Sequence, residues 1–224
     1  MLGACADTAG ESPENYVVRP EDTLYSIAWR HDLDFRDLAR WNNIGTDFRI
    51  SVGQVLVLGP ARESAATPAP GTAGPRAQNP PQVSRPRATN PQGDAPAMPS
   101  AAIGPLRWVW PTDRVGAPRP VPGGGILLSG RLGQDVRAAS AGRVVYTGSG
   151  LRGYGNLIII KHAESLLSAY AHNREVLVHD GQEVAMGQVI AHMGEGADLS
   201  PILYFEIRQN GRPVDPLPFL SRIK

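Results

Sequence analysis

The sequence has a single cysteine and only five histidines among its 224 residues. One cysteine can form neither an internal disulfide nor a thiolate metal site, so covalent or metal staples of that kind are excluded. Neither sign of charge is in excess, since the formal net charge is +1. That balance argues against nucleic acid as the main partner. No run of apolar residues in the sequence approaches the length that a membrane-spanning helix needs.

The position of the cysteine is informative. Leu2-Gly3-Ala4-Cys5 is typical of the end of a bacterial lipoprotein signal, in which small residues precede a cysteine that becomes lipidated. The basic start and apolar run of an export signal are missing before it. We therefore expect a truncated sequence, lipidation at Cys5 and attachment to a membrane through that lipid. The alternative is a cytoplasmic thiol beside a start methionine.

The 25 glycines and 21 prolines are unevenly distributed. Residues 59–105 are mostly alanine, proline, glycine, serine and arginine, with no aromatic residue and no periodicity. This composition predicts a disordered linker, whose typical end-to-end distance as a flexible coil is roughly 35 to 40 Å. We therefore expect an N-terminal tail at 1–15, a small domain at 16–58 and a second domain at 106–224.

The small domain combines strand and helix signals. Apolar residues at helical spacing follow Asp22 or Thr23, either of which would cap the helix. The predicted order is a strand at 16–18, a helix from residue 24, a second helix at 35–41, a turn at Gly53 and a strand at 55–58.

The segment YVVRPEDTLYSIAWRHDLDFRDLARWNN and the closing ISVGQVLVL resemble the LysM module, a small βααβ fold, across nearly its whole length. Glu21 is a departure, because the family usually has glycine at this place. The resemblance implies binding of N-acetylglucosamine-containing peptidoglycan strands through two loops. The implied glycan-binding residues are Asp22, Thr23, Leu24, Asn43 and Ile44. Helix capping by Asp22 and turn formation by the asparagines are the structural alternative, and both roles can coexist.

The second domain carries short apolar segments separated by glycine, and helical spacing is nearly absent. The predicted strands are 144–146, 157–161, 167–171, 188–192 and 203–208. Many short strands at close intervals predict a mainly antiparallel β structure.

Four segments of this domain, AASAGRVVYTGSGLRGYGNLIIIKH, LSAYAHN, GQEVAMGQVIAHMG and LYFEIRQNGRPVDPLPFL, resemble the LytM or lysostaphin-type peptidoglycan peptidase domain over roughly residues 107–220. Active members bind one zinc ion through two histidines and an aspartate and keep a position for water. The family spacing places the first histidine and the aspartate at Gly123 and Leu127. It places the family's His-x-His motif, which supplies the third ligand and a catalytic histidine, at Ile202 and Tyr204. Only His172 stands where the family has its other catalytic histidine.

A shifted alignment does not restore the ligands, because there is no histidine between His31 and His162 and no His-x-His anywhere in the chain. We expect His162, His179 and His192 to be surface or satisfied structural residues. Ser168 and His172 are four residues apart on a predicted strand and could share a face. Without an orienting acid, we interpret Ser168 as a structural serine. The acidic residues Asp198, Glu206 and Asp215 are likewise interpreted as framework residues.

The emptied site is expected to form an apolar groove with one tyrosine hydroxyl and one imidazole, which suits a peptide or helix. The predicted groove consists of Gly123, Leu127, Arg152, Tyr154, His172, Ile202 and Tyr204. Within the family, the chain is most similar to murein hydrolase activators.

The activator resemblance implies a periplasmic protein, anchored in the outer membrane at the division septum, without cofactor or catalysis. Its partner would be a zinc-dependent N-acetylmuramoyl-L-alanine amidase whose autoinhibition it relieves. The alternatives are an active zinc endopeptidase, a purely structural peptidoglycan anchor, or decay of an unused site.

Overall fold

The computed structural model describes residues 15–60, 106–113, 115–163 and 165–220. The predicted lipidation site Cys5 and nearly all of the predicted linker lie outside the described residues. The described residues before and after the linker belong to one compact unit. None of the described helices has both the length and the apolar character needed to cross a bilayer.

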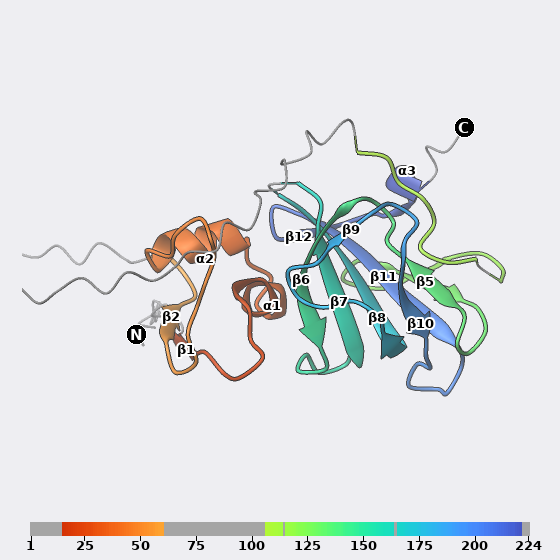
Figure 1. The fold of residues 1–224 in the computed structure, drawn as a ribbon, viewed down its shortest axis with the longest axis horizontal. Helices are drawn as coiled ribbons and strands as arrows, with labels where there is room; N and C mark the ends of the chain where they lie inside the picture. Colours follow the sequence, from red (N-terminus) through yellow and green to blue (C-terminus); the bar gives the residue numbers. More distant parts are fainter. Residues whose placement is uncertain (1–14, 61–105, 114, 164, 221–224) are drawn as a thin grey trace, which may run out of the picture. The chain divides into compact units, whose positions relative to one another are not determined.

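The N-terminal module has the predicted order of strand, helix, helix and strand (Figure 1). Its elements are β1 (Asn15–Val17), α1 (Leu24–Arg30), α2 (Phe35–Trp41) and β2 (Val55–Val57). The two strands pair antiparallel, with Tyr16 opposite Leu56. Both helices bury their apolar sides, because Leu24, Ile27 and Leu38 are fully excluded from solvent.

Side-chain caps fix where the helices of this module begin. Thr23 is the N-cap of α1: its hydroxyl accepts from the Ser26 amide, and the Ser26 hydroxyl accepts from the Thr23 amide. These bonds satisfy amides that have no partner within the helix. Of the two predicted caps, Thr23 is therefore the one used, while Asp22 accepts from the Tyr16 hydroxyl at 2.7 Å and pairs with Arg30 at 3.3 Å.

The carboxamide of Asn42 ties α2 to β2. Its nitrogen donates to the carbonyl oxygens of Leu38 and Val57 at 2.8 and 2.9 Å, and its oxygen accepts from the Val57 amide at 2.7 Å. One side chain thus satisfies the end of a helix and the edge of a strand.

The C-terminal module is built on one mixed-length antiparallel sheet (Figure 1). Its main path runs β3 (Arg119–Pro120), β4 (Ile126–Ser129), β11 (Ile202–Gln209), β8 (Leu166–Val176), β7 (Asn156–Lys161), β6 (Gly142–Gly148) and β9 (Glu183–Val184). Outside this path, β10 (Val189–Met193) pairs with β5 (Asp135–Arg137) and β8, and β12 (Arg212–Val214) pairs with β11. The five predicted strands are confirmed, whereas β3, β4, β5, β9, β12 and the short helix α3 (Leu217–Leu220) were not predicted.

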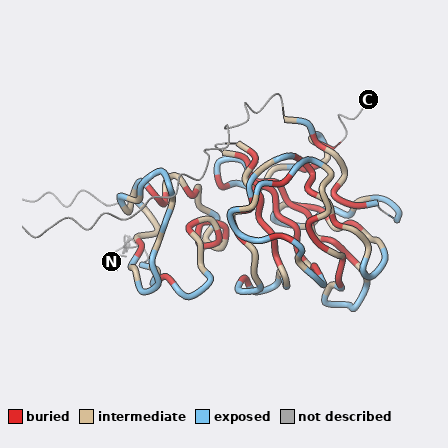
Figure 2. Tube along the Cα trace, viewed as in Figure 1, coloured by how far each residue is buried: buried red, intermediate tan, exposed pale blue. Residues whose placement is uncertain are grey.

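The central strands bury both of their faces, so the buried residues run along the strands while many turns are exposed (Figure 2). Along β11, Leu203, Phe205 and Ile207 enter one apolar core that also contains Trp108 and Ile190. Successive side chains of a strand point to opposite faces. Tyr204, Glu206 and Arg208 therefore line the other face.

A row of hydrogen-bonded side chains crosses the apolar core that contains Trp108 and Ile190. His162 Nε2 lies 2.7 Å from Ser168 Oγ, which donates to the Tyr170 hydroxyl at 3.0 Å, and that hydroxyl accepts from the Ala139 amide at 2.8 Å. Ser168 thus bonds His162 and Tyr170 rather than His172, and it has the structural surroundings expected of it. Burial lowers the pKa of His162 to about 4 and raises that of Tyr170 to about 12.

The left-handed backbone of Glu21 generates a first prediction. Its φ is +68°, a conformation that glycine adopts without a Cβ clash, and glycine is the usual residue of LysM modules here. Glu21→Gly should raise the free energy of unfolding of the N-terminal module by about 0.5 to 1 kcal/mol. Native-state hydrogen exchange of the α1 and α2 amides measures this. Glu21→Ala is the control and should give no gain, and an equal gain from alanine would contradict the explanation.

The buried imidazole of His162 generates a second prediction. Its pKa is about 4 when folded and 6.5 when exposed, so the unfolded chain binds more protons between those values and stability is lost as pH falls through that window. The full loss between pH 6.5 and 4 is about 3 kcal/mol. Urea unfolding at several pH values should show a smaller loss for His162→Gln than for the parent chain. Parallel pH curves for the two proteins would refute the assignment.

Candidate functional site: the former ligand positions of the peptidase fold

The strand register brings two of the predicted groove residues directly opposite each other. In the antiparallel pair of β4 and β11, Leu127 faces Tyr204. On the other side of β11, Tyr204 faces Ala171 of β8. Directly paired residues of neighbouring strands point to the same face of a sheet. Leu127, Tyr204 and Ala171 therefore form one row across the sheet.

The phenol of Tyr204 fills the centre of this site. A Cβ atom placed on Gly125 would lie 2.8 Å from the Tyr204 hydroxyl oxygen, so only glycine leaves room for the ring. The hydroxyl donates to the Glu206 carboxylate and lies 3.2 Å from the Gly124 carbonyl oxygen. Burial and the neighbouring Glu206 carboxylate raise the pKa of Tyr204 well above its ordinary value. The phenol thus stays protonated and acts as a donor.

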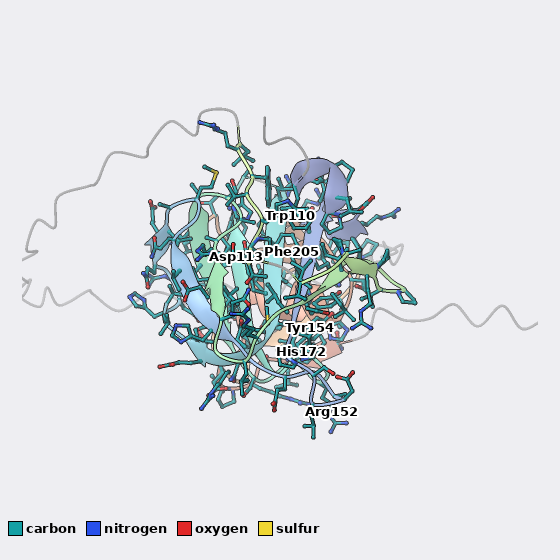
Figure 3. The ribbon with its side chains drawn as sticks, turned by 90° about the vertical axis from the view of Figure 1, so that its right-hand side faces the viewer. Trp110, Asp113, Arg152, Tyr154, His172 and Phe205 are labelled. Carbon is teal, nitrogen blue, oxygen red and sulfur yellow. The ribbon has the colours of Figure 1, made fainter. Side chains whose placement is uncertain are left out.

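Tyr154 and His172 border the same site. The rings of Tyr154 and Tyr204 meet edge to face with centroids 5.6 Å apart. The His172 amide donates to the Tyr154 carbonyl oxygen at 2.8 Å, and Figure 3 shows the two residues next to each other. His172 has a left-handed backbone with φ +63°, and burial lowers the pKa of its imidazole. Tyr154, His172 and Tyr204 thus form the aromatic part of the groove.

Other predicted groove residues lie elsewhere. Gly123 is exposed and open on the side where a Cβ would stand, because it belongs to the turn that precedes β4. Ile202 is only 4% exposed and packs beneath Gly196, so its side chain is not available to a partner. Arg152 is exposed beyond Tyr154, at the edge of the module (Figure 3). The groove is therefore narrower than the sequence predicted.

Two charged residues lie next to the groove: Glu206, which the sequence predicts as a framework residue, and Arg208, which no sequence motif singles out. Glu206 and Arg208 are 1% and 5% exposed and form an ion pair with a distance of 2.6 Å between Arg208 Nε and Glu206 Oε1. Their spacing from Tyr204 along β11 is the signal that could have revealed them, because alternate residues of a strand share a face. The groove is thus continuous with a buried charged row.

The residues that the family resemblance places at the three zinc ligands and at a catalytic histidine do not fit a zinc ion. Gly123, Leu127 and Ile202 offer no side-chain donor, and the phenol of Tyr204 is engaged with Glu206. Among the residues that the structure describes, no three or more histidine, cysteine, aspartate or glutamate side chains are grouped so as to hold a metal. Hydrolysis through a protein-held zinc ion therefore has no support in this donor set.

The predicted glycan-binding residues differ in how far they are buried and in the hydrogen bonds that they make. Leu24 is fully buried in the module core, so a ligand could reach only its backbone. The side chains of Asp22 and Thr23 are engaged in the bonds that hold β1 and α1. Asn43 is exposed with φ +53°, and the Ile44 amide donates to the Ala39 carbonyl oxygen at 2.9 Å. Structural roles are therefore present at each of these residues, including Asn43, whose amide donates to the Arg40 carbonyl oxygen at 3.4 Å while its side chain is exposed.

Two family models match the chain: the LysM domain over residues 16–59 and peptidase family M23 over residues 122–216. The NlpD/LppB lipoprotein homolog of Pseudomonas aeruginosa is 43% identical, and the match covers 92% of this chain and 77% of that protein. The chain belongs to the NlpD lipoprotein family. The uncharacterized lipoprotein YgeR of Escherichia coli is 39% identical, with 98% and 88% of the two chains covered. The murein hydrolase activator NlpD of Salmonella typhimurium is 38% identical, and the match covers 92% of this chain and 68% of that protein.

The donor set of this NlpD-family chain generates a third prediction. After incubation with zinc and dialysis, the purified protein should retain about 0.1 zinc ion per chain or less, because no three donors converge among the residues that the structure describes. Elemental analysis by mass spectrometry measures the ratio. His172→Ala should leave it unchanged. One zinc ion per chain, removable by a chelator and lost in His172→Ala, would show that a ligand set has been overlooked.

Proposed function

We propose that this chain is a non-catalytic activator of a zinc-dependent N-acetylmuramoyl-L-alanine amidase in the periplasm. The observation that carries the proposal is the phenol of Tyr204, which bonds Glu206 and lies opposite Leu127 at the place where the family resemblance implies a zinc site. A groove of this kind offers aromatic surface and hydrogen-bonding groups to a peptide segment. The names of the NlpD relatives as murein hydrolase activators support the same function.

Activation needs no chemistry from the groove itself. If the amidase exchanges between a closed and an open form, a partner that binds the open form more tightly shifts the equilibrium. A preference of about 3 kcal/mol shifts the ratio of the two forms roughly a hundredfold. Tyr154, His172 and Tyr204 would supply the contacts that distinguish the two forms.

The N-terminal module would hold the activator on peptidoglycan, which is the substrate of the amidase. LysM resemblance and the family match over residues 16–59 support binding to peptidoglycan strands. The lipoprotein names of the relatives support a cell-envelope location. Lipidation of Cys5, an outer-membrane anchor and action at the division septum complete the proposal. Tethering raises the local concentration of the activator near its amidase without any new contact.

The test is release of dye from labelled peptidoglycan sacculi. The chain alone should release nothing, while the chain with a cognate amidase should increase release over the amidase alone. Tyr204→Ala should raise the concentration for half-maximal stimulation about tenfold or more, as expected for an aromatic anchor at the centre of an interface.

Met186→Ala is the matched control, because Met186 is an exposed apolar residue of the same module outside the groove. It should stimulate like the parent chain. Circular dichroism checks that each variant is folded. Chelator-sensitive release by the chain alone would establish an endopeptidase instead. Binding to sacculi without any stimulation would leave a structural anchor.

A further inference from the structure

We propose that the LysM module of this chain occupies part of the sheet face on which the amidase would bind, so that docking of the module and binding of the amidase exclude each other. This inference rests on the proposed function. It identifies the second face of the sheet as an interaction surface whose resident occupant is the chain's own N-terminal module.

The first observation is a shared apolar cluster. The sheet contributes Tyr146, Leu157, Ile159, Leu167, Ala169 and Ala171, which are at most 5% exposed. The LysM module contributes the buried residues of α1 and α2 to the same cluster. An uncovered sheet face of this composition would expose a large apolar surface. The LysM module is therefore the cover of this face.

The second observation is the set of polar contacts that Arg208 makes with the LysM module. Its guanidinium carbon lies 3.9 Å from the ring centroid of Trp29. It also donates to the Trp29 carbonyl oxygen at 2.9 Å and pairs with Asp32 at 3.0 Å. Arginine stacked on tryptophan in a desolvated site is a strong and specific contact. Arg36 adds a bond of 2.8 Å to the side-chain oxygen of Asn210.

The third observation connects these contacts with the groove. Tyr204 donates to Glu206, Glu206 accepts from Arg208, and Arg208 holds Trp29 and Asp32. A continuous chain of hydrogen bonds thus runs from the centre of the groove to the end of α1. Tyr154 and Tyr204 themselves pack against the shared cluster. Movement of Tyr204 by a partner would therefore disturb the residues that hold the LysM module.

The distance between the groove and the contacts of the LysM module is too short for both the amidase and the docked module. Tyr204 and Arg208 are about 13 Å apart along the strand at 3.3 Å per residue. A helix with its side chains is about 10 to 12 Å wide. The space between the modules is a hollow of about 420 Å³, lined by Tyr16, Trp29 and Arg30 on one side and by Arg152, Tyr154 and Arg208 on the other. A helix laid over Tyr204 and Tyr154 would enter this hollow and meet the LysM side chains.

Gly211 offers a minimal variant that separates the modules. A Cβ atom on Gly211 would lie 2.6 Å from the Leu33 carbonyl oxygen of the LysM module, a backbone atom that cannot turn aside. Gly187 is the matched control, because it also has a positive φ, +80° against +74°, but nothing lies within 4 Å of its Cβ position. Gly211→Ala should therefore release the module, whereas Gly187→Ala should carry only the backbone strain.

The experiment uses the full chain in two measurements. Small-angle X-ray scattering should give a larger radius of gyration for Gly211→Ala and an unchanged one for Gly187→Ala. In the sacculus assay, Gly211→Ala should lower the concentration for half-maximal amidase stimulation at least about threefold, because a larger fraction of the chain is competent to bind. Asp32→Asn is a second variant, since it removes the charge that pairs with Arg208 while the exposed Asp32 side chain belongs to neither apolar core.

An unchanged radius of gyration in both Gly211→Ala and Asp32→Asn would overturn the docked arrangement. A larger radius without better stimulation would overturn the exclusion of the amidase. If neither the parent chain nor any variant stimulates the amidase, the proposed function fails, while the scattering result still decides whether the module is docked.

Discussion

Alternation of side chains along β11 is the constraint on which the rest of this structure depends. One set of residues, Leu203, Phe205 and Ile207, enters the apolar core. The other set, Tyr204, Glu206 and Arg208, forms a hydrogen-bonded row on the opposite face. Removing one partner of a buried ion pair costs about 3 to 5 kcal/mol, because the other charge is left without compensation. The polar row thus connects Tyr204 of the groove to the buried ion pair of Glu206 and Arg208.

Much of the architecture could be predicted from local patterns. In the N-terminal module, helical spacing and capping residues gave the correct order of elements, because these signals act within a few residues. In the C-terminal module, five apolar strands were evident for the same reason. The absence of histidine between His31 and His162 is sufficient to leave the family's first histidine ligand without a counterpart.

The remaining features depend on contacts between distant segments. β3, β5, β9 and β12 contain only two or three residues each and owe their existence to their partners, so no local pattern marks them. Burial of Leu24 and Ile202 likewise depends on what packs over them. The burial of Arg208 could not be predicted because an arginine on a strand usually reaches solvent, and its contacts include Trp29 and Asp32, which lie far away in the sequence.

The position of the Tyr204 phenol also makes a zinc site difficult to introduce in single steps. Replacing this tyrosine by histidine would withdraw the hydroxyl from buried Glu206, at a cost of about 1 to 3 kcal/mol, while Leu127 still offered no donor. Introducing an aspartate at Leu127 first would place a carboxylate opposite the phenol, close to the charge of Glu206. Each first substitution is therefore unfavourable by itself, so building a zinc site here would require several coordinated changes.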